Sequence, residues 1–401
     1  MKAHFFSLAI AVSLLVNIVP SYACTSAIFT GKATPDGRPL IWKHRDTGEL
    51  NNRMAYYPVS SANKYSFIGL LSSPSEGEIW YGSNSEGFVI MNTASYNLQE
   101  KKADMEDQEG IVMCKALGCC KNLADFEKML DKMKRPIGVE ANFGVIDAEG
   151  GAAYYEVNNY EWRKVDVNDP KIAPEGFLIY TNHSYTGRFN DGSGYIRYAN
   201  AHRNIYTRWI KGEGFTPEWI FDNLSRSFYN SILDYDLCKT PQAVQGGWFI
   251  DQDFIPRRST SAAIVAKGVK KGEDPSLTIM WAVLGYPPCG IAVPLFAAAG
   301  DKMPACMIKG SEGNNCKMCD ENLARRAKVF SNKRANAKNY FNFSLLYNEE
   351  GTGYMQLLHP YEASNFEVTE EFMAQQYEKG KLDPAAAGEL YKKINFGELV
   401  K

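Results

Sequence analysis

The sequence lacks the features that mark several common classes of protein. Its formal net charge is only −2 over 401 residues, so it has no field suited to nucleic acid. Beyond residue 19 it has no apolar run long enough to cross a bilayer. Its five histidines form no cluster with the Cys316-Lys-Met-Cys319 pair, which leaves a zinc site without enough ligands. We therefore expect no nucleic acid, no transmembrane span, no metal and no organic cofactor.

Internal repeats, low-complexity tracts and domain linkers are also missing from the chain. Hydrophobic residues make up 45% of the sequence and aromatic residues 13%, which is ample for one large core or two modest ones. The last sixty or so residues are charged and helix-prone. They are typical of a tail that wraps the main domain or of a subunit contact. The sequence therefore leaves open whether the protein forms a homo-oligomer.

Residues 1–23 have the pattern of a secretory signal peptide. Lys2 gives a positive start, residues 5–19 are almost all apolar, and Pro20 precedes the small residues Ser21 and Ala23. Cleavage after Ala23 would make Cys24 the first residue of an exported protein, periplasmic or extracellular. The alternative is lipid anchoring through the Cys24 sulfur, although a lipoprotein signal normally has a Leu-like residue at the position of Ser21. A lipidated cysteine has no free thiol.

Strand patterns dominate the chain, with helical patterns between them. Short runs rich in branched and aromatic residues are separated by Pro, Gly, Ser and Asn, which predicts an antiparallel meander in the first half. Apolar residues at helical spacing predict helices later in the chain. The expected strands are 25–29, 39–44, 53–59, 65–71, 78–81, 87–92, 143–146, 152–157, 176–181, 261–266, 277–284 and 290–296, and the expected helices are 122–134, 195–210, 217–228 and 322–338. This order favours a layered α+β domain with helices on the outer faces.

Without Cys24, eight cysteines remain, an even number that permits up to four disulfides in an oxidising compartment. Structural bridges or buried thiols explain them better than redox or zinc chemistry.

An N-terminal cysteine carries a base and a nucleophile on one residue. Its α-amine and its thiol have reference pKa values of about 7.7–8.0 and about 8.5. The amine can therefore accept the thiol proton and later return it to a leaving amine. In the stretch 42–46, Asp46 is a candidate to hold the amine, and Lys43 or Arg45 to favour the thiolate. Ordinary strand-end charges are the alternative for these three residues.

Several motifs resemble those of the N-terminal-nucleophile (Ntn) hydrolases that act on linear amide C–N bonds. This group includes choloylglycine hydrolases, penicillin V acylases, and acyltransferases acting on isopenicillin N and acyl-CoA; one segment also resembles cysteine dipeptidases. The similar stretches lie between residues 24 and 296, and are 24–37, 40–46, 82–87, 91–92, 142–147, 155–156, 180–182, 258–261, 280–287 and 293–294.

This resemblance assigns roles to residues position by position. Cys24 matches the nucleophile, Asp46 the carboxylate that orients its amine, and Asn92 and Asn182 the residues that form the oxyanion hole. Two positions depart from the group.

Lys43 stands where bile salt hydrolases have Arg, so the role stays with Lys43 or passes to Arg45. Gly194 stands where relatives carry a late catalytic Arg, and Arg197 aligns instead with a basic residue that neighbours it in the relatives. A solvated or structural charge is the alternative for Arg197, because the same predicted helix also carries Arg203 and Arg208.

The resemblance implies a four-layer αββα sandwich of two antiparallel sheets. We expect a signal peptide over 1–23, an Ntn-hydrolase domain over 24–340, and a helical extension over 341–401 packed on it. The expected reaction cleaves a small-molecule linear amide, of the acyl amide, bile salt or N-acyl amino acid type, through an acyl-thioester on Cys24. Acyl transfer or dipeptide cleavage at the same site is the alternative. A lipid-anchored binding protein is the rival from another class.

Aromatic residues near the motif strands are candidates for the acyl pocket, although most aromatics on a half-buried sheet belong to the core. These are Tyr56, Tyr57, Phe67, Trp80 and Tyr96. His44 and His183 flank expected site residues, and we interpret both as wall or packing residues because the α-amine already supplies the base.

Overall fold

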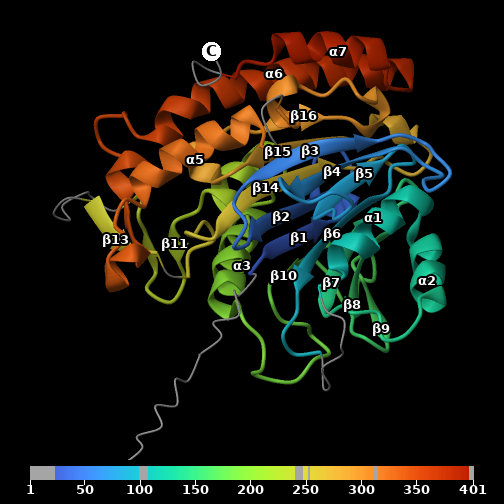
Figure 1. The fold of residues 1–401 in the computed structure, drawn as a ribbon, viewed down its shortest axis with the longest axis horizontal. Coiled ribbons are helices and arrows are strands. Elements are labelled where there is room, and N and C mark those ends of the chain that lie inside the picture. Colours follow the sequence, from blue (N-terminus) through green and yellow to red (C-terminus); the bar gives the residue numbers. More distant parts are fainter. Residues whose placement is uncertain (1–22, 99–106, 240–246, 252, 311–314, 397–401) are drawn as a thin grey trace, which may run out of the picture.

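Two antiparallel β-sheets face each other in the computed structural model, and helices cover their outer sides (Figure 1). The structure describes residues 23–98, 107–239, 247–251, 253–310 and 315–396. The expected signal peptide lies outside these residues, apart from Ala23. No helix among the described residues combines the length and the apolarity of a membrane span. The four-layer αββα class expected from the sequence is confirmed.

The seven-stranded sheet is a meander in chain order. Every strand pairs antiparallel with the next one along the chain. Turns and short loops join most of these pairs, whereas two helices within residues 109–132 separate β6 from β7. Its strands are β3 Asn52–Tyr57, β4 Phe67–Ser72, β5 Tyr81–Asn84, β6 Val89–Ala94, β7 Ala141–Ile146, β8 Ala152–Val157 and β9 Trp162–Asp166. β3 is therefore one edge strand of this sheet.

The six-stranded sheet mixes segments from distant parts of the chain, in the order β10-β1-β2-β14-β15-β16. Its strands are β1 Thr25–Phe29, β2 Leu40–Asp46, β10 Phe177–Tyr180, β14 Thr260–Lys267, β15 Ile279–Leu284 and β16 Val293–Leu295. β1 and β2 lie in its interior, and all residues of both are buried. The first described strand, β1, is thus held in the interior of this sheet.

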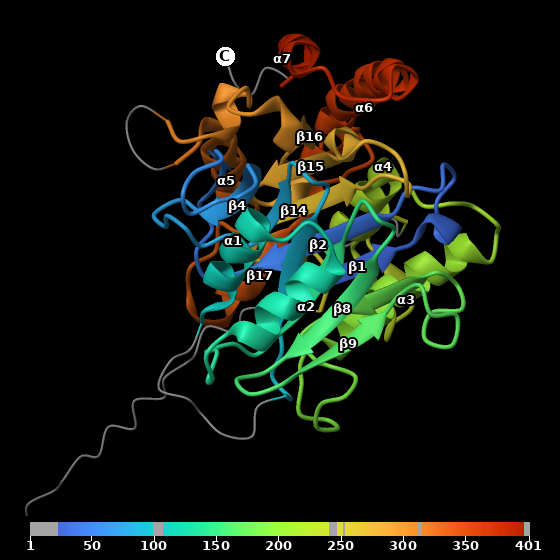
Figure 2. The same ribbon diagram turned by 90° about the vertical axis from the view of Figure 1, so that its right-hand side faces the viewer.

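Helices α1 (Glu109–Cys119) and α2 (Leu123–Lys132) cover the seven-stranded sheet (Figure 2). Their apolar side chains, with Leu117 and Phe126 among them, form a core cluster with the outward-facing residues of that sheet. Asn122 caps α2 by accepting a hydrogen bond from the Asp125 N–H.

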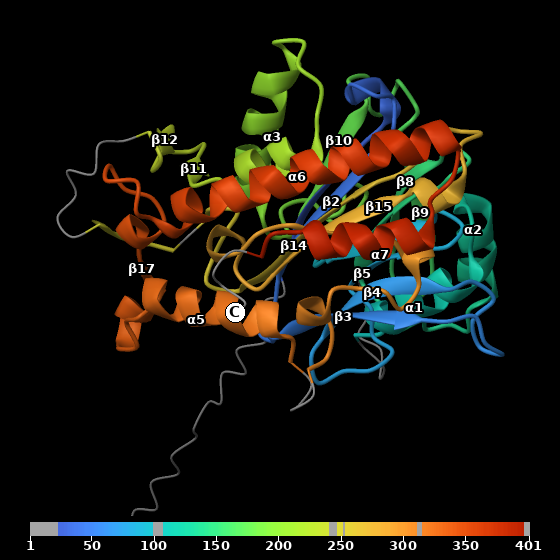
Figure 3. The same cartoon turned by 90° about the horizontal axis from the view of Figure 1, so that it is seen from above.

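Five helices follow the seven-stranded sheet in the chain, and most of them lie on the side of the six-stranded sheet. They are α3 Tyr195–Trp209, α4 Pro217–Ile220, α5 Lys317–Val329, α6 Tyr354–Lys379 and α7 Pro384–Lys393. Figure 3 shows α6 and α7 running side by side across this layer. Phe366 of α6 stacks on Trp281 of β15 with ring centroids 4.1 Å apart, so the last helices bury apolar surface against the sheet.

Two small two-stranded sheets complete the fold. β11 (Tyr229–Asn230) pairs with β12 (Tyr235–Asp236), and β13 (Trp248–Ile250) pairs with β17 (Tyr340–Asn342). Aromatic residues from this region, including Phe228, form a small core cluster of their own.

Some sequence expectations for individual elements were wrong. The structure adds α1 and β9, which the sequence reading missed, and the helix expected over 322–338 is instead α5, Lys317–Val329. α1 carries two glycines, which weaken a helical pattern, and β9 is an exposed, charged edge strand. All nine cysteines are free thiols, so the disulfides that the count permitted are not formed in this structure.

Candidate active site

Cys24 directly precedes β1, and side chains from other parts of the same chain hold both its N–H and its carbonyl group. Its side chain is buried, with 5% of the residue exposed. Its N–H donates to Asn182 Oδ1 at 3.0 Å, and its carbonyl oxygen accepts from Arg197 Nη1 at 2.6 Å. The residue that sequence analysis identified as the nucleophile is therefore fixed on both sides.

Arg197, in the first turn of α3, is the centre of this anchoring. Its guanidinium also donates to Thr25 Oγ1 at 2.9 Å and to Asn182 Oδ1 at 2.7 Å. Burial, together with the nearby Arg257, lowers the pKa of Arg197 to about 10, which still leaves it charged at neutral pH. Arg197 therefore binds the Cys24 residue directly and is no solvated surface charge.

Gly194 makes this approach of Arg197 possible. It precedes α3 with a φ of 83°, and a Cβ at this position would lie 2.4 Å from Arg197 Nη2. Only glycine adopts this backbone conformation without strain and leaves room for the guanidinium. The departure from the family pattern at Gly194 and the position of Arg197 thus belong to one local arrangement.

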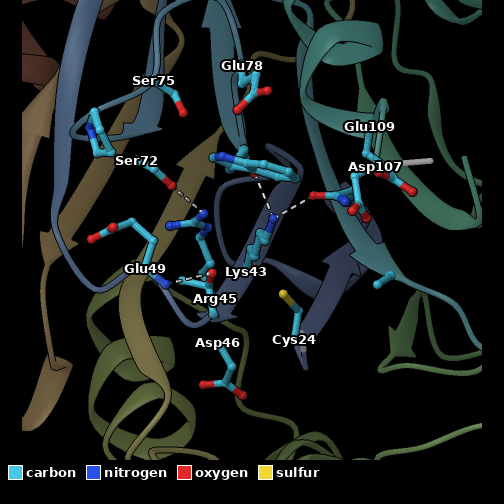
Figure 4. A pocket seen from close by; sticks show the side chains of 15 residues that line it. Cys24, Lys43, Arg45, Asp46, Glu49, Ser72, Ser75, Glu78, Asp107 and Glu109 are labelled. Carbon is cyan, nitrogen blue, oxygen red and sulfur yellow. Dashed lines mark hydrogen bonds between the residues drawn. The ribbon is translucent and has the colours of Figure 1, made fainter. Parts of the chain in front are cut away.

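A cavity of about 300 Å³ opens beside the Cys24 thiol. Figure 4 shows the sulfur pointing into it, toward the Lys43 side chain. The antiparallel register pairs Ser26 of β1 with Lys43 of β2, so Cys24, Lys43 and Arg45 share one face of the sheet. The lining residues are Cys24, Lys43, Arg45, Asp46, Thr47, Glu49, Ser72, Pro74, Ser75, Glu78, Trp80, Asn92, Ala94, Asp107 and Glu109.

Lys43 is a buried cation in this cavity, 1% exposed. Its Nζ donates to Asn92 Oδ1 at 2.7 Å and to the Trp80 carbonyl at 2.8 Å. Burial lowers the pKa of Lys43 to about 8; the Cys24 thiol opposes this shift and Arg45 adds to it. Lys43 therefore places a positive charge close to the thiol. This charge is lost when the pH rises just above neutral.

Arg45 forms the neighbouring wall of the cavity. Its Nη1 donates to Asn52 Oδ1 at 2.5 Å and its Nη2 to Ser72 Oγ at 3.0 Å. The guanidinium carbon lies 5.2 Å from the centre of a Trp80 ring. Arg45 thus keeps the planar charge of the motif. Its two shortest hydrogen bonds are directed at the seven-stranded sheet, and a third goes to Ser261 Oγ of β14 at 3.3 Å.

Asp46 points away from the cavity (Figure 4). Its carboxylate accepts hydrogen bonds from Arg257 Nη2 and Thr260 Oγ1, both at 2.5 Å. The same Arg257 nitrogen lies 3.5 Å from the Ala23 carbonyl oxygen. With Ala23 still attached, the Cys24 nitrogen is a peptide N–H that Asn182 accepts, and alternation along β2 turns the Asp46 side chain to the opposite face. The expected contact of Asp46 with a free Cys24 amine stays a prediction.

Asn182 and Asn92 differ in the hydrogen-bond partners of their side-chain amides. Asn182 Nδ2 donates to the Ala94 carbonyl at 2.8 Å, and its Oδ1 accepts from the Cys24 N–H and from Arg197 Nη2, so Asn182 anchors Cys24. Asn92 Oδ1 accepts from Lys43 Nζ, and the Asn92 amide nitrogen is a potential donor at the cavity wall. Of the two residues expected in an oxyanion hole, Asn92 has the better geometry.

Sequence reasoning missed the acidic residues of the cavity wall and the arginine that pairs with Asp46. Arg257 holds Asp46, and its only sequence signal was its position directly before the 258–261 motif. Glu109 opens α1 at the cavity, where burial raises the pKa of its carboxyl to about 7. No pattern in the sequence distinguished Glu109 from a surface acid.

The structure separates the other residues that the sequence suggested into those that line the cavity and those that do not. Of the five aromatics proposed for an acyl pocket, Trp80 lines the cavity, whereas Tyr57 and Phe67 stack on each other at 4.6 Å. His44 is fully buried, and burial lowers its pKa to about 4. The described residues contain no group of three or more potential metal ligands.

Comparison with known protein families finds one match, over part of the chain. Residues 34–206 match the family model of acyl-coenzyme A:6-aminopenicillanic acid acyl-transferase. This match confirms the resemblance to the Ntn linear-amide group that the motifs indicated. No curated protein sequence matches the chain.

Three solved structures are similar to the chain at low identity. An N-acylethanolamine-hydrolyzing acid amidase ortholog from Caenorhabditis elegans is 12% identical over 63% of this chain and 93% of its own, with a TM-score of 0.42. A mutant conjugated bile acid hydrolase from Clostridium perfringens is 13% identical over 68% and 92%, with a TM-score of 0.41. Penicillin V acylase from Agrobacterium tumefaciens is 11% identical over 65% and 83%, with a TM-score of 0.38.

Proposed function

We propose that this chain is an enzyme that transfers the acyl group of a linear amide to Cys24 and then to water. The proposal rests above all on one observation: the Cys24 thiol lines a cavity together with a buried lysine and an asparagine amide, while Asn182 and Arg197 hold its backbone. Removal of residues 1–23, as the sequence predicts, would add the free α-amine that the reaction needs. Export to the periplasm or the exterior is part of the same proposal.

In the proposed reaction the Cys24 amine takes the thiol proton, directly or through a water. The sulfur attacks the amide carbonyl carbon, and the growing charge on the carbonyl oxygen is met by the Asn92 amide N–H. The protonated amine then gives its proton to the leaving nitrogen, and water hydrolyses the thioester.

Two cations serve this reaction in different ways. Lys43 orients Asn92 through its 2.7 Å hydrogen bond and supplies positive charge beside the sulfur. Arg197 holds the Cys24 carbonyl at 2.6 Å, so that the nucleophile keeps its direction while the amine exchanges protons.

Acyl transfer is the second candidate. The matched family is named for an acyl-transferase, and an amine or thiol acceptor that competes with water would convert the same thioester into a transferred product.

Intact mass spectrometry tests the proposal directly. The purified mature protein is incubated with linear amides, including glycine- and taurine-conjugated bile acids and N-acyl amino acids. We expect a chain beginning at unmodified Cys24 that gains a transient acyl mass, and a product that gains the solvent oxygen. With an amine acceptor present, a transferred product would favour the acyl-transferase.

Variants of the nucleophile complete this test. Cys24→Ala should abolish turnover while the melting temperature stays near that of the native protein, and Cys24→Ser should leave only weak activity, since a hydroxyl is far less ionised. Cys238→Ala, a half-buried thiol outside the cavity, is the matched control. Full activity of Cys24→Ala would refute the mechanism, and a lipid-modified Cys24 would favour an anchored binding protein.

A further inference from the structure

The Cys316-Lys-Met-Cys319 pair at the start of α5 contacts the first residue of β3. Both thiols are fully buried. Cys319 Sγ accepts the Asn52 N–H at 3.3 Å, and Cys316 Sγ donates to the Asn52 carbonyl at 3.2 Å. Cys319 Sγ also donates to the Leu50 carbonyl at 3.6 Å. The two thiols therefore hold the backbone of a single residue, Asn52, from both of its polar groups.

Asn52 connects this dithiol to the proposed active site. Its side chain accepts from Arg45 Nη1 at 2.5 Å and donates to the Ser261 carbonyl of β14 at 2.9 Å. Asn52 thus joins the edge of the seven-stranded sheet to the six-stranded sheet, and it holds the guanidinium that forms one cavity wall.

Covering an exposed sheet edge is the simplest role for these thiols, since unpaired backbone groups of an edge strand need partners. That role explains the contacts to Asn52 and Leu50 but involves no group of the cavity. The contact between Asn52 and Arg45 adds a consequence: anything that shifts the Asn52 backbone also shifts the charge beside the substrate.

We propose that Asn52 is a positioning residue for Arg45, and that the Cys316/Cys319 dithiol is a redox-sensitive support that holds Asn52 in place. Where it concerns activity, the proposal rests on the function proposed above. According to this proposal, the protein with reduced Cys316 and Cys319 is more active than the protein in which they form a disulfide.

The redox step balances with a small disulfide as the oxidant. One cysteine thiolate attacks the disulfide and releases one thiol; the second cysteine then displaces the other half, so the pair is oxidised and the reagent is reduced to two thiols that carry the protons. The new S–S bond is about 2.05 Å long. Neither sulfur then carries a hydrogen to donate, so the Asn52 and Leu50 carbonyls lose their donors and the sulfurs shift from their Asn52 partners.

The test compares fully reduced protein with protein equilibrated with oxidised glutathione, with the Cys316–Cys319 disulfide verified by peptide mass. We expect kcat/KM of the oxidised form to be about tenfold lower, because Arg45 loses one hydrogen bond that involves a charge. The alkaline limb of its pH profile should also move upward, since Arg45 then lowers the Lys43 pKa less. A role confined to edge covering would leave this limb unchanged.

Variants separate the proposed route from oxidation elsewhere. The Cys316→Ser/Cys319→Ser double variant keeps hydroxyl donors and should be insensitive to the oxidant, whereas Cys238→Ser should behave like the native protein. Asn52→Ala should be about tenfold less active in both redox states, and its effect should not add to that of Arg45→Ala. The proposal would be overturned if the oxidant inactivated the double variant as much as the native protein. Full activity of native protein with a verified Cys316–Cys319 disulfide would also overturn it.

Hydrogen exchange gives a readout that does not depend on turnover. The Asn52 N–H, bonded to Cys319 in the reduced protein, should exchange faster after oxidation, and a peptide covering 50–57 reports it. If no form of the protein turns over an amide, the proposed function fails while this measurement still tests the support of Asn52. Unchanged exchange in verified disulfide-bonded protein would overturn that support.

Discussion

The two faces of β2 carry four consecutive ionisable residues into two different environments. Lys43 and Arg45 face the cavity and the seven-stranded sheet, whereas His44 and Asp46 face away from it, toward Thr260 and Arg257. The cavity face has its charges close to the Cys24 sulfur, and the opposite face has the Asp46 charge in a buried ion pair with Arg257. One compact sequence motif therefore supplies two functions, and a strand's period of two separates them.

The largest effect that tests this comparison is expected for Asp46→Ala. The Asp46 side chain is fully buried and pairs with Arg257, whose side chain is 20% exposed. Removing one partner leaves a charge without its counterion, so we expect the free energy of unfolding to fall by about 3 kcal/mol. Urea unfolding measures it.

The control for Asp46→Ala is Glu49→Ala, a half-buried carboxylate at the cavity, for which we expect a loss of about 0.5 kcal/mol or less. If Asp46→Ala kept its stability but lost all turnover, Asp46 would serve the Cys24 amine directly, as the family resemblance implied.

The next effect is expected on the cavity side, at Asn92. Asn92→Ala removes the proposed oxyanion donor, so kcat should fall about 100-fold, equivalent to about 2.7 kcal/mol, with a smaller change in KM. Asn92→Asp is the matched variant, because it keeps the shape and an acceptor for Lys43 but has no N–H to donate. Steady-state kinetics that find Asn92→Asp as active as the native protein would exclude the oxyanion role.

A smaller effect concerns the pH dependence of activity through Lys43. Since its pKa is lowered to about 8 by burial, the ammonium is present below that pH and is lost above it. We expect kcat/KM to decline above about pH 8, and the decline to disappear in Lys43→Met, whose activity at pH 7 should be about tenfold lower. A decline that persists unchanged in Lys43→Met would belong to another group.

The sequence predicted most strands of both sheets because each is a short buried run of branched and aromatic residues bounded by turn residues. It missed α1, whose glycines and β-branched residues hide the helical pattern, and this helix carries Glu109 into the cavity. A local sequence pattern does not indicate which segments pack together in the fold. Glu109 was therefore not predictable, because it reaches the site only through the packing of α1.

The candidate site was predictable by residue type but not by geometry. Cys24, Lys43 and Asn92 meet at one cavity, as their roles in the resembled group suggest. The partner of Asp46 was not predictable, because Arg257 lies 211 residues away in the chain. The register of β2 against β14 brings the two together, and register depends on the whole sheet.

The smallest effect on activity is expected at His44, the neighbour of Lys43 on the opposite face. Burial lowers the pKa of His44 to about 4 from its usual 6.5, so between these values the unfolded chain binds a proton that the folded protein does not. The free energy of unfolding should therefore rise with pH from about 4 to 6.5. His44→Gln should flatten this rise and leave the pH profile of kcat/KM unchanged, whereas His359→Gln, at an exposed position of α6, should leave the rise as it is. Thermal unfolding across this pH range measures the slope, and a change in the activity profile of His44→Gln would mean that the two faces of β2 are coupled.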